Sequence, residues 1–273
     1  MLTLPECKLV FLCGPVASGK TFLIKTWLAR DNRHVVFDGS GEFMGDPEHE
    51  QIWANPKALH ARLRANPYFY KIAYQPGLDR EEDFAWVLKA MWWIEQPKLL
   101  VCDEFHEICP VEYRPPEVEM MLRFARHDKL GFVGASQRIA DVNKLYTSAC
   151  RLVILFQTNE ARDLEAAEDR WGCGRQLEAL RPLLHDDVTG VTRQVPQCLV
   201  IEKGQRPYVY DFQTESRVES AREREGNRES PEQRGSPGGT GEIDSSEDAI
   251  SEAPDAGSGD RGLADDSLGD ITK

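Results

Sequence analysis

The chain has 273 residues, 41% of them apolar, and its 46 acidic residues against 33 basic ones give a net charge of −13. Its longest apolar runs fall far short of the roughly 18–20 residues that span a bilayer, and its first residues lack the basic and apolar regions of a secretory signal. Seven cysteines without a C-x-x-C pair argue against a disulfide framework or a zinc site, so we expect a reduced, cytoplasmic protein.

The acidic excess is concentrated at the end of the chain. Residues 215–273 carry 16 acidic and 7 basic side chains, are rich in Gly, Ser and Pro, and include no aromatic residue. Such a segment buries too little apolar surface to offset the entropy that is lost on ordering. We therefore expect a folded domain over residues 1–214 and a disordered acidic tail over residues 215–273.

Short apolar runs alternate with segments of helical periodicity through the first domain. The predicted strands are 8–13, 34–37, 70–74, 98–102, 131–136 and 151–156. The predicted helices are 20–30, 56–65, 81–95, 117–127, 160–170 and 175–184. Two late runs, 198–202 and 208–212, predict a C-terminal hairpin. This alternation predicts an α/β fold, in which a mainly parallel central sheet is flanked by helices.

The loop after the first predicted strand matches the phosphate-loop pattern G-x-x-x-x-G-K-[ST]. It comprises Gly14, Pro15, Val16, Ala17, Ser18, Gly19, Lys20 and Thr21. Its glycines allow backbone amides to turn toward a phosphate, and the helix that follows adds its positive end. We expect a nucleoside triphosphate to bind here, with Lys20 reaching the outer phosphates and Thr21 placing its hydroxyl on Mg2+.

Two acidic residues, Asp103 and Glu104, follow the apolar strand 98–102. A hydrated Mg2+ ion binds close to a carboxylate, and Asp103 can supply one through water. Glu104 is then free to orient and deprotonate an attacking water molecule. The next strand, 131–136, ends in Gln137, whose amide can contact the terminal phosphate or the water and so sense the phosphate.

Two predicted strands, 34–37 and 70–74, lie between the phosphate loop and the strand that ends at Asp103. This spacing is typical of the RecA-like (ASCE) phosphate-loop ATPases, which have an inserted strand and an extra catalytic glutamate. It fits small-molecule kinases less well.

Four sequence blocks carry a family resemblance. They are GPVASGKT at 14–21, DGSGEF at 38–43, LLVCDE at 99–104, and a segment with ARH at 125–127 and ASQRIAD at 135–141. Together they resemble the HerA/FtsK superfamily of DNA-pumping ATPases over roughly residues 8–170. The first block is shared by all phosphate-loop nucleoside triphosphatases, whereas ASQRIAD is the block that points to this particular superfamily.

Differences from the larger members of the superfamily indicate which of its branches the chain resembles. The phosphate loop begins at Gly14, so we expect neither the β-barrel of cellular HerA proteins nor the membrane region of FtsK before it. No membrane segment follows the core, as one does in Zot-like phage assembly ATPases. The chain is most similar in build to the genome-packaging ATPases of tailless, membrane-containing viruses.

The resemblance implies a ring, usually a hexamer, that binds ATP and Mg2+ at its subunit interfaces. In such a ring an arginine of one subunit reaches the neighbouring site and stabilises charge on the transferring phosphoryl group. The candidates are Arg126, Arg138, Arg151 and Arg162. We favour Arg126, because its predicted helix ends beside the strand that leads to Gln137. Asp38 and Glu42 follow the second strand and are expected at the edge of the site.

These observations predict an ATP-driven translocase of double-stranded DNA that packages a viral genome into a preformed capsid. Its expected partners are capsid or membrane proteins at the packaging vertex, and its expected location is the host cytoplasm, with the virion as a second one. The alternatives are a cellular or plasmid HerA-like translocase, a small-molecule phosphotransferase with an arginine-rich lid from residues 175–193, and a non-enzymatic assembly scaffold. No strong stripe of Lys and Arg marks a DNA path.

Overall fold

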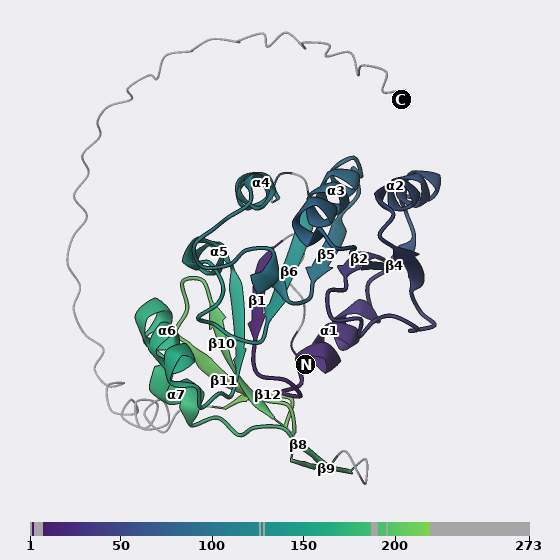
Figure 1. Ribbon diagram of the computed structural model, residues 1–273. Helices are drawn as coiled ribbons and strands as arrows, with labels where there is room; N and C mark the ends of the chain where they lie inside the picture. Colours follow the sequence, from purple (N-terminus) through teal and green to yellow (C-terminus); the bar gives the residue numbers. More distant parts are fainter. Residues whose placement is uncertain are drawn as a thin grey trace, which may run out of the picture. The chain divides into compact units, whose positions relative to one another are not determined.

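A ten-stranded sheet forms the centre of the computed structural model, which describes residues 2, 8–125, 127, 129–186, 191–194 and 196–218 (Figure 1). In spatial order its strands are β12 (Ser216–Val218), β11 (Tyr208–Asp211), β10 (Gln197–Glu202), β7 (Leu152–Phe156), β1 (Leu9–Cys13), β6 (Leu130–Ser136), β5 (Lys98–Cys102), β2 (Arg33–Phe37), β4 (Tyr70–Gln75) and β3 (Glu50–Trp53). Neighbouring strands from β7 to β3 run parallel, whereas β10, β11 and β12 pair in antiparallel fashion. This mainly parallel sheet, with the β10–β11 hairpin at one side, confirms the predicted fold class.

Helices cover both faces of the sheet (Figure 1). They are α1 (Lys20–Leu28), α2 (Pro56–Ala65), α3 (Arg80–Trp92), α4 (Pro116–Phe124), α5 (Lys144–Ala149), α6 (Ala161–Trp171) and α7 (Gly174–Glu178). A single turn of 3-10 helix, η1 (Phe105–Glu107), follows β5.

Alternate side chains of the central strands enter two apolar cores, one on each face of the sheet. In β1, Val10 and Leu12 pack in the core that α1 covers, whereas Phe11 packs in the core that α2 to α7 cover. Because side chains alternate between faces along a strand, a strand buried on both sides needs apolar residues at every position. This explains why the central strands are continuous apolar runs in the sequence.

The sequence prediction misses several elements and makes the last predicted helix too long. β3, α5, β12 and a separate two-stranded sheet of β8 (Leu184–Asp186) and β9 (Val191–Gln194) were not expected from the apolar pattern. The apolar spacing predicts a helix over residues 175–184, whereas α7 ends at Glu178. Pro182 explains the difference, because proline lacks an amide donor and disfavours helical backbone at the preceding residue.

The sheet continues beyond residue 214, where the sequence places the end of the folded domain. In β12, Ser216 pairs with Asp211 and Val218 pairs with Val209 of β11. The rest of the predicted acidic tail, residues 219–273, lies outside the described residues.

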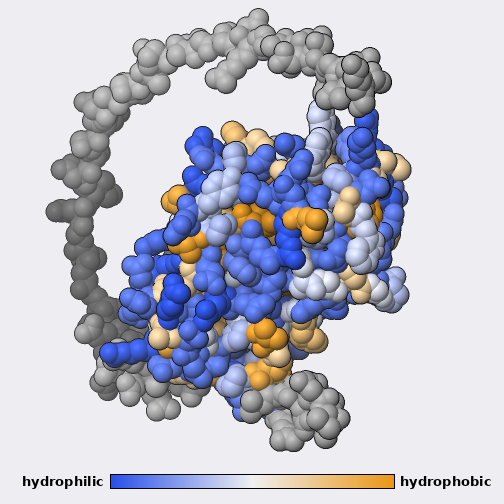
Figure 2. All heavy atoms as spheres, in the orientation of Figure 1, coloured by the Kyte–Doolittle hydropathy of each residue, from blue (hydrophilic) through white to orange (hydrophobic). Residues whose placement is uncertain are grey.

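Hydrophilic side chains predominate on the face shown in Figure 2, where hydrophobic residues form small separate patches. None of the helices in the described part of the chain has the length and apolar character that crossing a bilayer requires. The described cysteines, which are Cys13, Cys102, Cys109, Cys150, Cys173 and Cys198, are buried and form no disulfide with one another.

Candidate nucleotide-binding site

The loops after β1, β2, β5 and β6 meet at the carboxyl edge of the sheet, where ligands of open α/β folds bind. The strand ends are in register there, since Cys13 of β1 pairs with Ser136 of β6. Together the loops and the start of α1 border a cavity of about 280 Å³. Its lining residues are Val16, Ala17, Ser18, Gly19, Lys20, Thr21, Phe22, Glu42, Asp103, Glu104, Gln137 and Leu183. All predicted catalytic and metal-binding residues except Arg126 are among them.

The phosphate loop needs glycine at two positions, for different reasons. At Gly14 a Cβ atom would lie 2.6 Å from Cβ of Phe156 and 2.7 Å from Oγ of Ser18, so no side chain fits. Gly19 has a φ of 107°, a left-handed conformation that side chains disfavour, and α1 begins at the next residue. Oγ of Ser18 is buried and has no hydrogen-bond partner among the described residues. A phosphate bound in this loop would give that hydroxyl an acceptor.

Lys20 lies inside the loop, with 8% of its surface exposed. Its Nζ donates to the carbonyl oxygen of Gly14 at 2.6 Å and to that of Pro15 at 3.0 Å. Burial lowers the pKa of Lys20, and the carboxylates of Glu104 and Asp103 counteract this effect. The ammonium group therefore lies between the loop carbonyls and the acidic side chains, within reach of a phosphate chain in the cavity.

The loop after β2 is folded around the buried carboxylate of Asp38. This carboxylate accepts the backbone N–H groups of Gly41 and Glu42 at 3.0 Å and that of Phe43 at 2.9 Å. Burial raises the pKa of Asp38, while the three backbone donors oppose the rise. Asp38 thus stabilises the conformation of the loop through these hydrogen bonds. Of the two acidic residues predicted at the edge of the site, Asp38 and Glu42, only Glu42 is among the described residues that line the cavity.

Two hydroxyl groups connect this loop to the other loops of the site. Oγ of Ser40 donates to Oδ2 of Asp103, and Oγ1 of Thr21 donates to Oε2 of Glu42. Asp103 is 7% exposed, and burial raises its pKa to about 6, with the carboxylates of Glu104 and Glu42 adding to the rise. The cavity therefore concentrates negative charge that a divalent cation would offset.

The oxygen atoms of Thr21 and Asp103 fit Mg2+. This ion takes hard oxygen ligands, keeps several waters, and is usually held by one or two carboxylates together with substrate phosphates. Within the described part of the chain, no three His, Cys, Asp or Glu side chains gather into a site that would hold a metal ion by themselves. The donor set is thus one that phosphates and water would complete.

Glu104 lies between side chains from two other positions. Nε2 of Gln137 donates to its Oε1 over 2.5 Å, and Nδ1 of His106 lies 3.3 Å from its Oε2. Glu104 has a φ of 53°, a left-handed conformation that is uncommon outside glycine. This conformation turns the chain into η1, which carries His106. His106 is not among the predicted site residues, because its position after Asp103 indicates a contact only once this turn is known.

The candidate arginines that the structure describes do not line the cavity. Arg126 lies outside the described residues. Arg138, Arg151 and Arg162 are described, and none of them lines the cavity. Lys20 is the single cation among the described lining residues.

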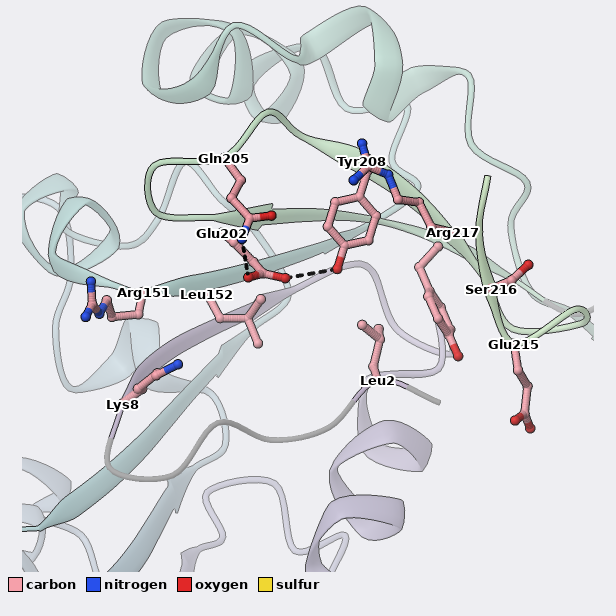
Figure 3. Close-up of a pocket in the computed structure, with 11 residues that line it drawn as sticks. Leu2, Lys8, Arg151, Leu152, Glu202, Gln205, Tyr208, Glu215, Ser216 and Arg217 are labelled. Atoms are coloured by element: carbon pink, nitrogen blue, oxygen red, sulfur yellow. Dashed lines mark hydrogen bonds between the residues drawn. The ribbon is translucent and has the colours of Figure 1, made fainter. Parts of the chain in front are cut away.

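A second cavity, of about 480 Å³, lies at the amino edge of the sheet, beside the start of β1 and the strands β10 to β12 (Figure 3). There Glu202 accepts hydrogen bonds from the hydroxyl of Tyr208 and from Nε2 of Gln205, both at 3.1 Å. The guanidinium of Arg217 lies 4.7 Å from the centre of the Tyr208 ring. Although this cavity is larger, no phosphate-loop residue lines it, so the cavity beside Lys20 is the candidate nucleotide site.

No protein-family model matches the chain, and no curated protein matches it. Solved structures do match, at low sequence identity. The genome-packaging NTPase B204 of Sulfolobus turreted icosahedral virus 2, in complex with ATP-gammaS, is 16% identical with a TM-score of 0.59, over 78% of this chain and 96% of that chain. Its complex with AMPPCP is 17% identical with a TM-score of 0.57 over the same shares.

B204 of Sulfolobus turreted icosahedral virus, described as a DNA-packaging ATPase, is 14% identical with a TM-score of 0.55, over 78% of this chain and 96% of that chain. These matches confirm the predicted resemblance at the level of structure. The chain therefore has the fold of B204, a P-loop ATPase fold with a large, mostly parallel sheet flanked by helices.

Proposed function

We propose that the chain is an ATPase that translocates double-stranded DNA and packages a viral genome into a preformed capsid. The observation that carries the proposal is the convergence of Lys20, Asp103, Glu104 and Gln137 on one cavity beside the phosphate loop. The fold shared with B204 supports it, because B204 is a genome-packaging NTPase that binds ATP-gammaS and AMPPCP.

Nucleotide binding would engage the groups of the phosphate loop. Lys20 would exchange the carbonyls of Gly14 and Pro15 for the outer phosphates, and the buried hydroxyl of Ser18 would gain an acceptor. Mg2+, held by Thr21 and through water by Asp103, would neutralise charge on the phosphates. A buried ammonium group near bound phosphates interacts with them more strongly than one in bulk water does.

Hydrolysis needs a group that takes a proton from the attacking water. As the water oxygen bonds to the terminal phosphorus, the bond to the bridging oxygen breaks, and the water proton passes to the carboxylate of Glu104. Gln137 donates to that carboxylate in the structure. With a terminal phosphate in the site, its amide would bind the phosphate and leave one oxygen of Glu104 free for the water.

The charge that develops on the phosphoryl group calls for a second cation. Lys20 is the single cation among the described lining residues, which favours a ring in which a neighbouring subunit supplies an arginine. Arg126 is our first candidate, because it lies between α4 and β6 in the sequence, and β6 leads to Gln137. A hexamer is the ring size that the resemblance implies.

DNA binding by such a motor would use phosphates and not base edges, since it must pass any sequence. The test is the rate of ATP hydrolysis with and without double-stranded DNA at low and moderate salt, with molecular mass measured by light scattering in the same buffers. We expect a ring whose ATPase rate rises with DNA of any sequence and whose stimulation fades as salt rises. A monomer that ignores DNA but turns over faster with a small phosphoryl acceptor would support the phosphotransferase instead.

The remaining alternatives predict other outcomes. A cellular or plasmid translocase would pass the DNA test but would not bind capsid-vertex proteins, which a pull-down with the viral capsid proteins measures. A non-enzymatic scaffold would tolerate loss of the Glu104 carboxylate without a change in assembly or in function.

A further inference from the structure

The turn after Glu104 brings His106 to the carboxylate that the proposed reaction uses as its base. Nδ1 of His106 lies 3.3 Å from Oε2 of Glu104. That oxygen is buried and has no hydrogen-bond partner among the described residues, and Nδ1 of His106 lies at ion-pair distance from it. The other oxygen, Oε1, is occupied by Gln137. Gln137 thus holds one oxygen of the carboxylate, and His106 faces the other, buried oxygen, which lacks a donor in the described part of the chain.

The polar groups that face Nδ1 of His106 favour a proton on this atom. Besides Oε2 of Glu104, Oγ of Ser136 lies 3.5 Å from Nδ1. The Ser136 hydroxyl donates to the carbonyl oxygen of Arg138 at 3.0 Å, and a hydroxyl has one hydrogen to give. Toward His106 it can therefore only accept, as the Glu104 carboxylate can. Because both neighbours are acceptors, Nδ1 is assigned as the donor.

Neighbours on both sides of His106 anchor its turn. The ring of Phe105 is fully buried, with its centroid 4.5 Å from that of Tyr146. Glu107 forms an ion pair with Arg80, the first residue of α3. The backbone at His106 is therefore fixed between a core contact and an ion pair, which limits where its ring can lie.

We propose that His106 is a positioning residue that donates from Nδ1 to Oε2 of Glu104 and keeps this carboxylate directed at the attacking water. This inference rests on the proposed function, in which Glu104 is the general base. The contact from His106 matters because Gln137 would give up its hydrogen bond to Oε1 when a terminal phosphate binds. Among the described side chains, His106 would then be the donor that faces the carboxylate, and the long 3.3 Å contact would tighten in the complex.

The test compares His106→Asn, which retains an N–H donor near the position of Nδ1, with His106→Leu, which has a similar branched shape without a donor. We expect His106→Leu to lower kcat about tenfold, as the loss of one hydrogen bond to a charged group predicts. KM and the affinity for ATP should not change, because the carboxylate acts on the water and not on nucleotide binding. His106→Asn should recover most of the rate.

Thermal melts of both variants show whether the turn still folds. A His106→Leu enzyme as fast as the wild type, or equal losses in the Asn and Leu variants with intact melts, would overturn the positioning role. Single-turnover rates in a Glu104→Gln background separate the two proposals. If Glu104→Gln itself hydrolyses ATP normally, the proposed function fails. If it is impaired but His106→Leu lowers its rate a further tenfold, only the inference about His106 fails.

Discussion

The amide of Gln137 donates to Oε1 of Glu104 over 2.5 Å, and this bond joins the loop after β6 to the loop after β5. The amide takes up one of the two lone pairs of this oxygen and, by donating to it, makes the oxygen a weaker base toward water. The bond therefore links the action of the proposed base to the position of the amide that would sense the phosphate.

Replacing Glu104 with Gln should leave ATP binding intact and reduce turnover by orders of magnitude, because the phosphate loop remains while the proton acceptor is lost. Lys20→Ala should instead prevent binding, since it removes the cation at the centre of the loop. Binding of a fluorescent ATP analogue and steady-state hydrolysis by the same preparations measure the contrast. Unchanged turnover in Glu104→Gln would contradict the assignment of the base.

Gly14→Ala should deform the phosphate loop, because the added Cβ would lie 2.6 Å from Cβ of Phe156. We expect a loss of about 1–3 kcal/mol of folding free energy, as for other overpacked sites, together with weaker nucleotide binding. Gly172→Ala is a matched control, since Gly172 has a φ of 65° but no atom within 4 Å of the added Cβ. It should lose stability through the backbone without losing affinity for ATP. Denaturant unfolding and nucleotide titration give both quantities, and equal affinities for the two variants would exclude the close approach as the reason for Gly14.

Asp103 should make the nucleotide-free protein less stable as pH rises. Burial raises its pKa to about 6, so the folded chain keeps a proton that the unfolded chain releases near pH 4. Stability is therefore lost between about pH 4 and pH 6, and the penalty is complete above that range. Relative to the wild type, Asp103→Asn should gain about 3 kcal/mol more at pH 8 than at pH 4 when Mg2+ is absent. Urea unfolding at the two pH values tests this, and a gain that does not depend on pH would contradict it.

The end of the folded domain can be tested by truncation. A chain ending at Val218 retains β12, and we expect it to fold and hydrolyse ATP as the full chain does, because residues 219–273 have the composition of a disordered tail. A chain ending at Thr214 loses the pairing of β12 with β11 and should melt at a lower temperature. Insoluble protein from the chain ending at Val218 would show that the tail contributes to the fold.

Most of the sheet could be predicted because its central strands are buried on both faces and are therefore apolar throughout. β3 could not, since Ile52 is the only one of its four residues that is buried, and its conformation follows from pairing with β4. The end of α7 could not be predicted from apolar spacing, which continues through Leu180 to Leu184, whereas Pro182 interrupts the helix.

The candidate site also has residues that the sequence predicts and contacts that it does not. Lys20, Asp103 and Glu104 follow apolar strands in recognisable patterns, so the sequence indicates them before the structure is known. The contact between His106 and Glu104 depends on a left-handed φ at a glutamate, which no residue pattern predicts.

The central claim, ATP hydrolysis that drives movement along DNA, is tested most directly by displacement of a third strand from a triplex on double-stranded DNA. We expect the wild-type chain to release the third strand with ATP and Mg2+, at a rate that does not depend on the flanking sequence. Glu104→Gln should bind ATP and DNA without releasing it. Rapid ATP hydrolysis by a ring bound to this DNA, with no release of the third strand, would contradict the claim.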